Sequence, residues 1–497
     1  MTAKKHGIGT HYLRYSTGNL LVIMAGLVSF PVLTRLLDNT QYGILGYYDT
    51  WVLMAVAVGK LGAQHAIMRF YPHGGDAERL RAFSTNLFYL PLAISLALWA
   101  VAGFGVIVVD LATGARQSGV FWLAVAAAPL MVFASLVETV LRVTEHSRIV
   151  MVTRAGWRWL ELVLMLGAVV LLQHSAVAAY GGKLLAAGLV IVFYARWMRN
   201  NLGFSRSALD PPSLREGLIY GLPLLANEII AVALVTLDRL MIKAITGDFA
   251  AVGVYSIGAS LAMQVNVFMN ITVFEAFTPM ANRLYMTEGP AAVRALKARV
   301  LLPMTYAAIG IATLLWCFGA DAIIALSGHA KSASGPVFAM VGVVYALLPV
   351  LLVAGYGLLL EKRTVKVMSL MCGSLLVNAA LNLVWIPKYG VMGAVYATAV
   401  SSTALAIAHC AWVPRELMKL PELRTVLTAG LVSMACVAIV STTGLWGLQV
   451  GWPRLLVGGA ATGAAYALSV LAADRRLRDM MFGWIGPRLA MRAGKRA

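Results

Sequence analysis

The amino-acid sequence predicts an all-α integral membrane protein, and two observations carry that prediction. The 497 residues are 60% hydrophobic and only 12% charged, with a mean hydropathy of +0.80. Soluble domains carry about 25% charged residues, so this chain has too few charges to cover several soluble cores. In addition, stretches of about 20 mainly apolar residues, long enough to cross a bilayer, recur along the whole chain.

About fourteen such stretches are expected to be transmembrane helices. Those in the first half lie at 15–37, 45–68, 84–109, 118–141, 153–172, 175–195 and 217–243. Those in the second half lie at 250–280, 300–320, 335–360, 365–386, 390–413, 424–447 and 454–473. The least typical is 153–172, because Arg154, Arg158 and Glu161 occupy its first half. The first stretch lacks a small-residue cleavage site, so we expect a retained helix and not a signal peptide.

The positive charge is distributed as expected for loops between these helices. The formal net charge is +19. If the N-terminus is cytoplasmic, every loop on that side holds three or more Lys or Arg residues, whereas the opposite loops hold roughly one each. This asymmetry is the positive-inside pattern, and with an even number of helices it places both termini in the cytoplasm. No basic soluble face is evident, so nucleic acid is not an expected partner.

A weak internal repeat predicts how the helices are grouped. Residues 32–48 ("VLTRLLDNTQYGILGYY") and 235–255 ("VTLDRLMIKAITGDFAAVGVY") each end a helix with an Arg-Leu pair, cross a polar turn and restart at a glycine followed by a tyrosine. Both are expected to run outwards, and parallel repeats are a transporter architecture. Chance similarity between two membrane helices is the alternative. The predicted division is a first six-helix lobe at 1–200, a second at 201–413, two further helices at 414–473 and a basic cytoplasmic tail at 474–497.

Residue types that carry enzymatic or metal chemistry are not arranged in recognisable patterns. The four cysteines lie in apolar runs without CxxC spacing, which is typical of buried thiols. The eight histidines form no HExxH-type motif. We find no P-loop, no Gly-x-Ser-x-Gly and no paired carboxylates beside a nucleophile. The sequence therefore predicts neither an enzyme nor a bound metal or cofactor.

Lys60 is the most unusual residue in the apolar stretches, because it lies near the middle of the expected helix 45–68. Helical spacing puts Asp49, eleven residues earlier, and Gln64, four residues later, on its face, which would form a polar stripe. Ionisable residues inside a membrane usually face a bundle interior or a wet cavity. The alternative is that the lysine extends to the membrane surface. At roughly 13 Å from the inner end its stem is too short, so the cavity is favoured.

Further polar residues lie in other expected helices. Lys183, which follows two glycines, has the same two interpretations, and neither is favoured. Glu228 and Arg239 are eleven residues apart and so share a face, and Glu228 is the deeper of the two. A desolvated Glu228 would hold a proton, because burial disfavours the charged carboxylate. For amides such as Asn270, Asn378 and Asn382, hydrogen bonding between helices is the alternative to lining a cavity.

These side chains together predict a wet interior that contains cations and amides. Lys and Arg pair with phosphate oxygens, and amides hydrogen-bond to sugar hydroxyls. The expected ligand is therefore an anionic head group.

Two segments resemble the polysaccharide-type oligosaccharide flippases of the multidrug/oligosaccharidyl-lipid/polysaccharide exporter superfamily. Residues 30–51 ("FPVLTRLLDNTQYGILGYYDTW") resemble the first loop of that family. Residues 221–258 ("GLPLLANEIIAVALVTLDRLMIKAITGDFAAVGVYSIG") resemble its seventh helix and the following turn, where a Gly-x-Pro start, an Asp-Arg pair and a Gly-x-Tyr-Ser restart recur. The helix number and the repeat agree, so the resemblance covers most of the chain.

The resemblance implies two six-helix lobes in a V shape around a central cavity, which rock between inward-open and outward-open states. It implies transfer of an undecaprenyl-pyrophosphate-linked oligosaccharide from the cytoplasmic to the periplasmic leaflet of a bacterial inner membrane. A polysaccharide polymerase and a chain-length regulator are the implied protein partners. The implied head-group residues are Lys60, Gln64, Lys183, Arg239 and, at the repeat counterpart of Lys60, Asn270. Glu228 and Asp49 are the candidate coupling or cavity carboxylates.

Three other functions compete with this interpretation. A cation-coupled drug or metabolite antiporter of the same superfamily would need a deep carboxylate cluster, for which Glu228 alone is thin support. A flippase for the peptidoglycan precursor would bind the same kind of head group, although the loop motifs favour the polysaccharide branch. A membrane polymerase or ligase would need a large outside loop rich in Arg and His, which the sequence does not contain.

Overall fold

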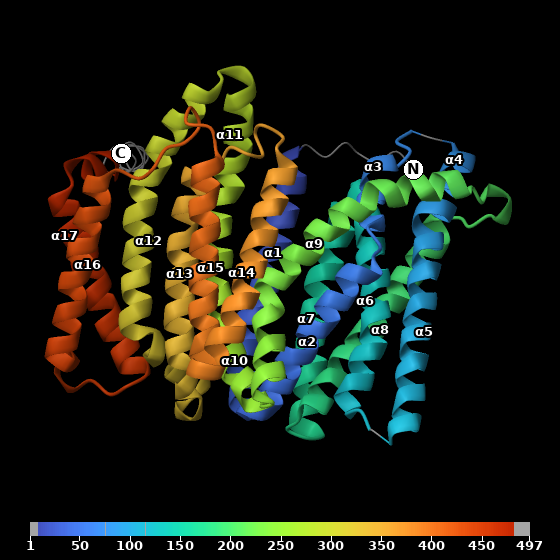
Figure 1. Ribbon diagram of the computed structural model, residues 1–497, viewed down its shortest axis with the longest axis horizontal. Helices are drawn as coiled ribbons and strands as arrows, with labels where there is room; N and C mark the ends of the chain where they lie inside the picture. Colours follow the sequence, from blue (N-terminus) through green and yellow to red (C-terminus); the bar gives the residue numbers. More distant parts are fainter. Residues whose placement is uncertain (1–7, 75, 115, 482–497) are drawn as a thin grey trace, which may run out of the picture. The chain divides into compact units, whose positions relative to one another are not determined.

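The computed structural model of the chain describes residues 8–74, 76–114 and 116–481, and these residues form helices and connecting loops without a strand (Figure 1). The chain divides into two compact units, Met1–Gly253 and Val254–Ala497. The expected lobe boundary at residue 200 differs from this division, so the two six-helix lobes stay a prediction. Most of the expected basic tail at 474–497 lies outside the described residues.

The first unit contains the helices that precede residue 249 and the start of the helix that follows it. In chain order they are α1 (Ile8–Leu36), α2 (Asn39–Gly59), α3 (Ala63–Phe70), α4 (Ala77–Phe83), a π-helical turn (Ser84–Tyr89), α5 (Leu90–Thr113), α6 (Gly119–Val143), α7 (Ser147–Leu171), α8 (Ala176–Asn201), a 3₁₀ turn (Arg206–Ala208), α9 (Pro211–Thr246) and α10 (Phe249–Met269).

The second unit begins within α10. It continues with a π-helical turn (Asn270–Phe274), α11 (Glu275–Thr287), α12 (Pro290–Ser327), a 3₁₀ turn (His329–Ser334), α13 (Gly335–Ala354), α14 (Thr364–Tyr389), α15 (Val391–Trp412), α16 (Leu423–Thr443), a 3₁₀ turn (Gly444–Gly447), a π-helical turn (Arg454–Gly458) and α17 (Gly459–Ala473). In this unit α12 to α15 lie side by side, and α16 and α17 pack on α12 (Figure 1).

The all-α membrane class is confirmed, and the expected number of spans is approximate. Within the described residues eleven helices are long and apolar enough to cross a membrane, and the bent pair of α2 and α3 makes a twelfth. Two expected spans, α1 and α7, fall outside this set. For α1 only the apolar stretch Leu21–Leu36 could be compared, so the span expected at 15–37 stays a prediction. The charges of α7 are paired, because Arg154 contacts Glu138 of α6 at 2.5 Å and Arg158 contacts Glu161 at 3.2 Å.

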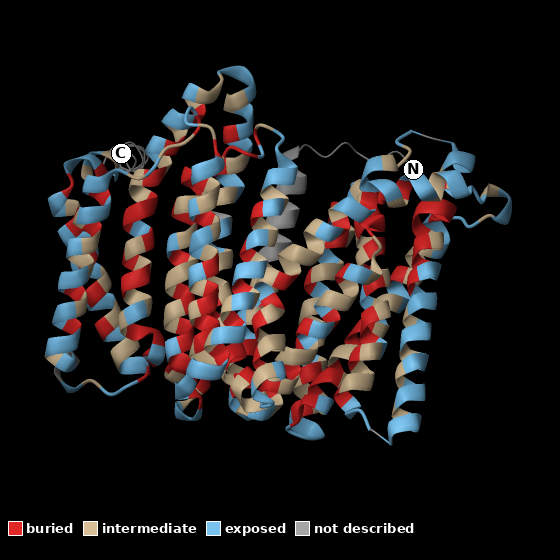
Figure 2. Ribbon diagram, in the orientation of Figure 1, coloured by how far each residue is buried: buried red, intermediate tan, exposed pale blue. Residues whose placement is uncertain are grey.

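Apolar side chains face outwards along the spans, as a lipid environment requires. Most of α5 is exposed (Figure 2), including Leu98, Val101, Phe104 and Leu111. Lipid tails are as apolar as leucine, so such a surface is stable only in a bilayer. The chain is therefore a multi-pass membrane protein.

Buried polar residues of the second unit hydrogen-bond between helices. Asn382 Nδ2 donates to Asn378 Oδ1 at 3.0 Å, and Asn378 Nδ2 donates to the hydroxyls of Thr398 and Ser401 on α15 at 3.4 Å. Hydrogen bonding between helices is therefore the correct interpretation for Asn378, whereas Asn382 bonds to Asn378 within α14.

Lys297 lies just before the expected span 300–320, and its side chain is fully buried on α12. Its ammonium donates to the backbone oxygens of Ala354 at 3.0 Å and Leu417 at 2.5 Å. Ala354 is the last residue of α13, whose terminal carbonyls have no partner within the helix and carry partial negative charge. Lys297 on α12 therefore provides a hydrogen-bond donor for a carbonyl at the C-terminus of α13.

The two repeat segments meet at the starts of their helices, and the contact is reciprocal. A β-carbon on Gly43 would lie 1.8 Å from the oxygen of Phe249, the first residue of α10. A β-carbon on Gly253 would lie 1.8 Å from the oxygen of Asn39, the first residue of α2. Each glycine thus lies one turn into its own helix and against the first residue of the other. Such reciprocity is typical of a two-fold relation, so the contact favours a true repeat over chance similarity.

This contact predicts that Gly43→Ala lowers stability. Alanine improves helix propensity by about 1 kcal/mol, but its methyl group would displace the α10 backbone, and overpacking of this kind costs about 1–3 kcal/mol. We expect a lower unfolding temperature of the detergent-solubilised protein for Gly43→Ala and for Gly253→Ala. The matched control is Gly105→Ala in α5, where the added β-carbon meets nothing within 4 Å. Unfolding of Gly43→Ala at the wild-type temperature would contradict the contact.

Candidate functional site

The helix that carries Lys60 is broken at this residue, which corrects the expected continuous helix 45–68. α2 ends at Gly59 and Lys60 is its C-cap. Leu61 and Gly62 have φ of 52° and 73°, and α3 then begins at Ala63 with a bend of 47°. Left-handed backbone is strained for leucine but not for glycine. The chain therefore changes direction at the buried lysine.

The break lies directly against the backbone of α9. A β-carbon on Gly62 would be 2.4 Å from the oxygen of Gly221, and a β-carbon on Gly221 would be 2.6 Å from the oxygen of Gly62. One turn before, Gly217 faces Ala66 of α3 and Leu87 of the π-helical turn. Because these positions lack side chains, the two backbones touch, as in membrane helix pairs with small-xxx-small spacing.

Pro223 shapes α9 beside this contact. The helix begins at Pro211, so Pro223 lies well inside it. Proline cannot donate the helical hydrogen bond and crowds the preceding turn, which bends a helix. α9 accordingly changes direction along its length (Figure 1).

Four polar side chains converge two turns further along α9. Lys60 Nζ donates to Glu228 Oε1, and Gln64 Nε2 donates to Glu228 Oε2. His65 Nε2 lies 4.0 Å from the same Oε2. Glu228 follows Gly221 by seven residues and so shares its face of the helix. The glycine contact thus brings Lys60 and Gln64 into hydrogen-bonding range of Glu228, with His65 close by. These four residues are called the Lys60 cluster.

The Lys60 cluster is largely shielded from solvent, and the opposite charges of Lys60 and Glu228 give their pair no net charge. The exposed fraction of the Lys60 side chain is 11% and that of Glu228 is 25%. Lys60 is therefore not the unpaired cation that the sequence suggested. Two buried atoms, Gln64 Oε1 and His65 Nε2, have no hydrogen-bond partner among the described residues. Such atoms are rare in native proteins. Gln64 Oε1 accepts hydrogen bonds and therefore suits a hydroxyl donor, whereas His65 Nε2 suits a hydroxyl or, when it carries the ring proton, a phosphate oxygen.

Asp49 and Lys183 form a separate pair. Lys183 Nζ donates to Asp49 Oδ1 at 2.8 Å and to Oδ2 at 2.7 Å, and it also lies 5.3 Å from the centre of the Tyr180 ring. Asp49 precedes Lys60 by eleven residues, or about 16 Å of helix. The expected polar stripe is therefore divided, because Asp49 pairs with α8 while Lys60 pairs with α9. Lys183 pairs across helices, an arrangement that the sequence analysis did not consider.

The remaining predicted residues lie apart from the Lys60 cluster or in the other unit. Arg239 follows Glu228 by eleven residues, which is about 16 Å along α9. Asn270 belongs to the second unit, where its Nδ2 donates to the backbone oxygen of Asn266 at 2.8 Å. Their roles as head-group ligands stay predictions.

Sequence reasoning missed His65. The histidines were inspected for metal-binding spacing, which His65 does not have. The available signal was its place next to Gln64 and five residues after Lys60. No group of three or more His, Cys, Asp or Glu side chains that could hold a metal occurs among the residues that the structure covers.

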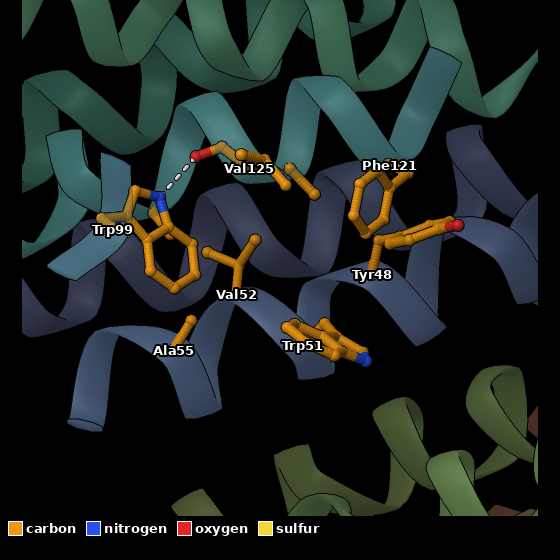
Figure 3. Close-up of a pocket in the computed structure, with 9 residues that line it drawn as sticks. Tyr48, Trp51, Val52, Ala55, Trp99, Phe121 and Val125 are labelled. Atoms are coloured by element: carbon orange, nitrogen blue, oxygen red, sulfur yellow. Dashed lines mark hydrogen bonds between the residues drawn. The ribbon is translucent and has the colours of Figure 1, made fainter. Parts of the chain in front are cut away.

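An apolar cavity of about 480 Å³ adjoins the break in α2. Gly59 and Leu61, the two neighbours of Lys60, line it together with residues of α5 and Leu240 of α9. A much smaller pocket lies further along α2, where Tyr48, Val52 and Ala55 face α5 and α6 (Figure 3). Its wall is fixed by Trp99, whose indole nitrogen donates to the backbone oxygen of Val125 at 2.8 Å. The charged cluster is thus bordered by space for apolar chains.

Comparison with known proteins identifies the family. The family model described as polysaccharide biosynthesis protein matches residues 10–285, which is more than half of the chain. The chain belongs to the polysaccharide biosynthesis protein family. No curated protein sequence matches this family member significantly.

Solved structures show that this polysaccharide biosynthesis protein has a transporter fold. The structure of the lipid II flippase MurJ in an inward-closed conformation is similar with a TM-score of 0.70, at 11% identity over 94% of this chain and 99% of that chain. An inward-facing multidrug transporter of the MATE family is similar with a TM-score of 0.60, at 15% identity over 86% of this chain and 98% of that chain. The sequence resemblance to the flippase superfamily is confirmed, and the fold is the one that these two solved transporter structures share.

The structure predicts that Lys60 and Glu228 stabilise the protein only together. Lys60→Met or Glu228→Leu alone leaves a mostly buried charge unpaired, so we expect each to lower the free energy of unfolding by about 2–3 kcal/mol. The double variant removes both charges and is expected to recover most of that loss. A double-mutant cycle from unfolding in detergent measures the coupling.

The control is the exposed pair Arg476–Glu422, whose side chains are 63% and 48% exposed. Arg476→Met and Glu422→Leu are each expected to cost less than about 1 kcal/mol, with little coupling. Strictly additive effects of Lys60→Met and Glu228→Leu would show that the two residues do not pair.

Proposed function

We propose that this protein moves an undecaprenyl-pyrophosphate-linked oligosaccharide from the cytoplasmic to the periplasmic leaflet of a bacterial inner membrane. The transport would serve surface polysaccharide biosynthesis, such as that of lipopolysaccharide O-antigen or exopolysaccharide. The observation that carries the proposal is the Lys60 cluster, a partly buried ion pair beside an apolar cavity, with two polar atoms that have no partner among the described residues. The family description, polysaccharide biosynthesis protein, supports the substrate class.

The chemistry of the Lys60 cluster fits the linkage of such a lipid. A diphosphate offers several anionic oxygens, and Lys60 offers an ammonium that pairs with them. The buried Gln64 Oε1 and His65 Nε2 offer partners to the first sugar. The adjoining cavity of about 480 Å³ offers an apolar surface to the isoprenoid chain. One site thus has groups that can bind the diphosphate, the first sugar and the isoprenoid chain of the substrate.

The ion pair provides a way to couple binding to a change of state. The Glu228 carboxylate accepts hydrogen bonds from both Lys60 and Gln64 in this structure. A diphosphate must therefore displace this carboxylate to bind the two side chains. Protonation of Glu228 weakens its hold on Lys60, since a neutral carboxyl no longer attracts the ammonium. In this proposal the substrate and a proton act on the same carboxylate. Displacement separates α3 from α9 at the Lys60 cluster and favours the alternate state.

The proposal also includes the wider arrangement expected from the sequence. Lobes at 1–200 and 201–413 would alternate around the site, with both termini in the cytoplasm. Asp49–Lys183, Arg239 and Asn270 would contact the glycan or its linkage at other stages of the cycle. A polysaccharide polymerase and a chain-length regulator would receive the product.

Cation-coupled antiport is the second candidate, and Glu228 favours it. A carboxylate in a transporter cavity is a common site for a coupling cation. However, the Glu228 carboxylate is already paired with Lys60, which lowers its attraction for a cationic drug. Flipping of the peptidoglycan precursor would use the same head-group chemistry, so an assay with defined lipids must separate that function.

The double variant Lys60→Met/Glu228→Leu tests the function. Its stability is expected to be close to that of the wild type, yet it has no ammonium for the diphosphate. In the source bacterium we expect loss of surface polysaccharide and accumulation of undecaprenyl-linked glycan in the cytoplasmic leaflet, at a normal protein level. Lys60→Ala should show the same defect with a lower protein level.

The control is Arg158→Met/Glu161→Leu, which removes a comparable pair from α7 and should leave surface polysaccharide unchanged. Normal surface polysaccharide in Lys60→Met/Glu228→Leu would refute the assigned role of the cluster. Loss of drug resistance, with unchanged polysaccharide, would favour antiport. A block of peptidoglycan synthesis would favour the precursor flippase.

A further inference from the structure

A third pocket, of about 240 Å³, lies in the second unit at one end of the spans. It is formed where α12, the connection between α15 and α16, the start of α16 and the segment after α17 meet. The Lys60 cluster belongs to the first unit and shares no residue with this pocket.

The lining of this pocket is basic on one part and apolar on another. Its charged residues are Arg299, Lys419, Arg476 and Glu422. Glu422 accepts a hydrogen bond from Arg476 at 2.8 Å. The side chains of Arg299 and Lys419 make no ion pair with the described residues, so two positive charges are uncompensated. The apolar part is formed by Leu301, Leu302, Leu420 and Met480.

The change from basic to apolar lining coincides with the boundary of the apolar spans. Arg299 is the last cation on α12 before an apolar run that begins at residue 300. α16 begins at Leu423 and α17 ends at Ala473, so both have an end beside the pocket. The loops at this end carry most of the positive charge, which by the positive-inside rule is the cytoplasmic side. The pocket therefore lies at head-group depth in the leaflet that is rich in anionic lipid.

We infer that this pocket binds the head group of an anionic phospholipid, such as phosphatidylglycerol. Arg299 and Lys419 contact the phosphate from two different segments, and Leu301, Leu302 and Leu420 contact the glycerol and the first part of the acyl chains. Basic pockets between membrane helices on the cytoplasmic side commonly hold anionic head groups. A bound lipid would link α12 to α16, and this role is independent of the transported substrate.

Lipid binding to the purified full-length protein tests the inference. Native mass spectrometry in detergent would be used to titrate dioctanoyl phosphatidylglycerol, with dioctanoyl phosphatidylcholine and inorganic phosphate as comparison ligands. We expect phosphatidylglycerol to bind about tenfold more tightly than phosphatidylcholine, because each nearby cation favours an anionic lipid. Arg299→Gln/Lys419→Gln should lower the phosphatidylglycerol affinity about tenfold. Glu422→Gln, which removes the opposing carboxylate, should raise it.

The matched control is Arg283→Gln/Arg415→Gln, which removes two exposed cations that do not line the pocket. It should change the affinity less than about twofold, as should Lys60→Met/Glu228→Leu. An equal loss in Arg283→Gln/Arg415→Gln would overturn the inference in favour of general surface attraction. Displacement of the lipid by millimolar inorganic phosphate would overturn it in favour of a soluble anion. Loss of binding in Lys60→Met/Glu228→Leu would assign the lipid to the Lys60 cluster instead.

Discussion

The contact between the backbones of Gly62 and Gly221 is the constraint on which the candidate site depends. Because neither residue has a side chain, the break between α2 and α3 lies directly on α9. Any larger residue at either position would hold the two backbones further apart. At that greater separation Lys60 and Gln64 could not both reach Glu228, which lies two turns along the same face. The position of the Lys60 cluster is thus set by the lack of side chains at Gly62 and Gly221.

This close approach explains how a lysine persists inside an apolar span. An ammonium in hydrocarbon is costly when it is alone, and the cost falls when a carboxylate and hydrogen-bond partners surround it. Glu228 provides the opposite charge, and the Gln64 amide hydrogen-bonds to the same carboxylate. Gln64 Oε1 and His65 Nε2 have no hydrogen-bond partner in the part of the chain that the structure describes, so these residues do not satisfy the cluster fully. A site that is neutral but incompletely hydrogen-bonded is suited to exchange partners with an anionic, hydroxyl-rich ligand.

The sequence alone predicted the class and many polar residues, but not their pairing. Hydropathy identifies spans because the length of an apolar run follows from bilayer thickness. Hydropathy also identified Lys60 and Glu228 separately, because each is an ionisable residue inside an apolar span. Their contact joins residues 168 positions apart and depends on a kink at Leu61, a residue that gives no sign of left-handed backbone. Helical spacing assigned Asp49 to Lys60, whereas packing of α8 gives it Lys183. Lys297 was missed for the same reason, because its partners are backbone oxygens of distant segments.

The helix α2 is held at both ends by glycine contacts, and this arrangement determines which of its interactions can change easily. At its start Gly43 lies on α10, and just beyond its end Gly62 lies on α9. Interdigitated side chains resist sliding, whereas backbone surfaces at glycine positions have no side chains to interlock. The polar cluster is different, because its bonds depend on charge, and charge responds to a proton or to a competing anion. A ligand can shift an equilibrium only through interactions that differ between the two states. Within the first unit, the pair of Lys60 and Glu228 is an interaction of that kind, and it lies beside a contact that permits movement.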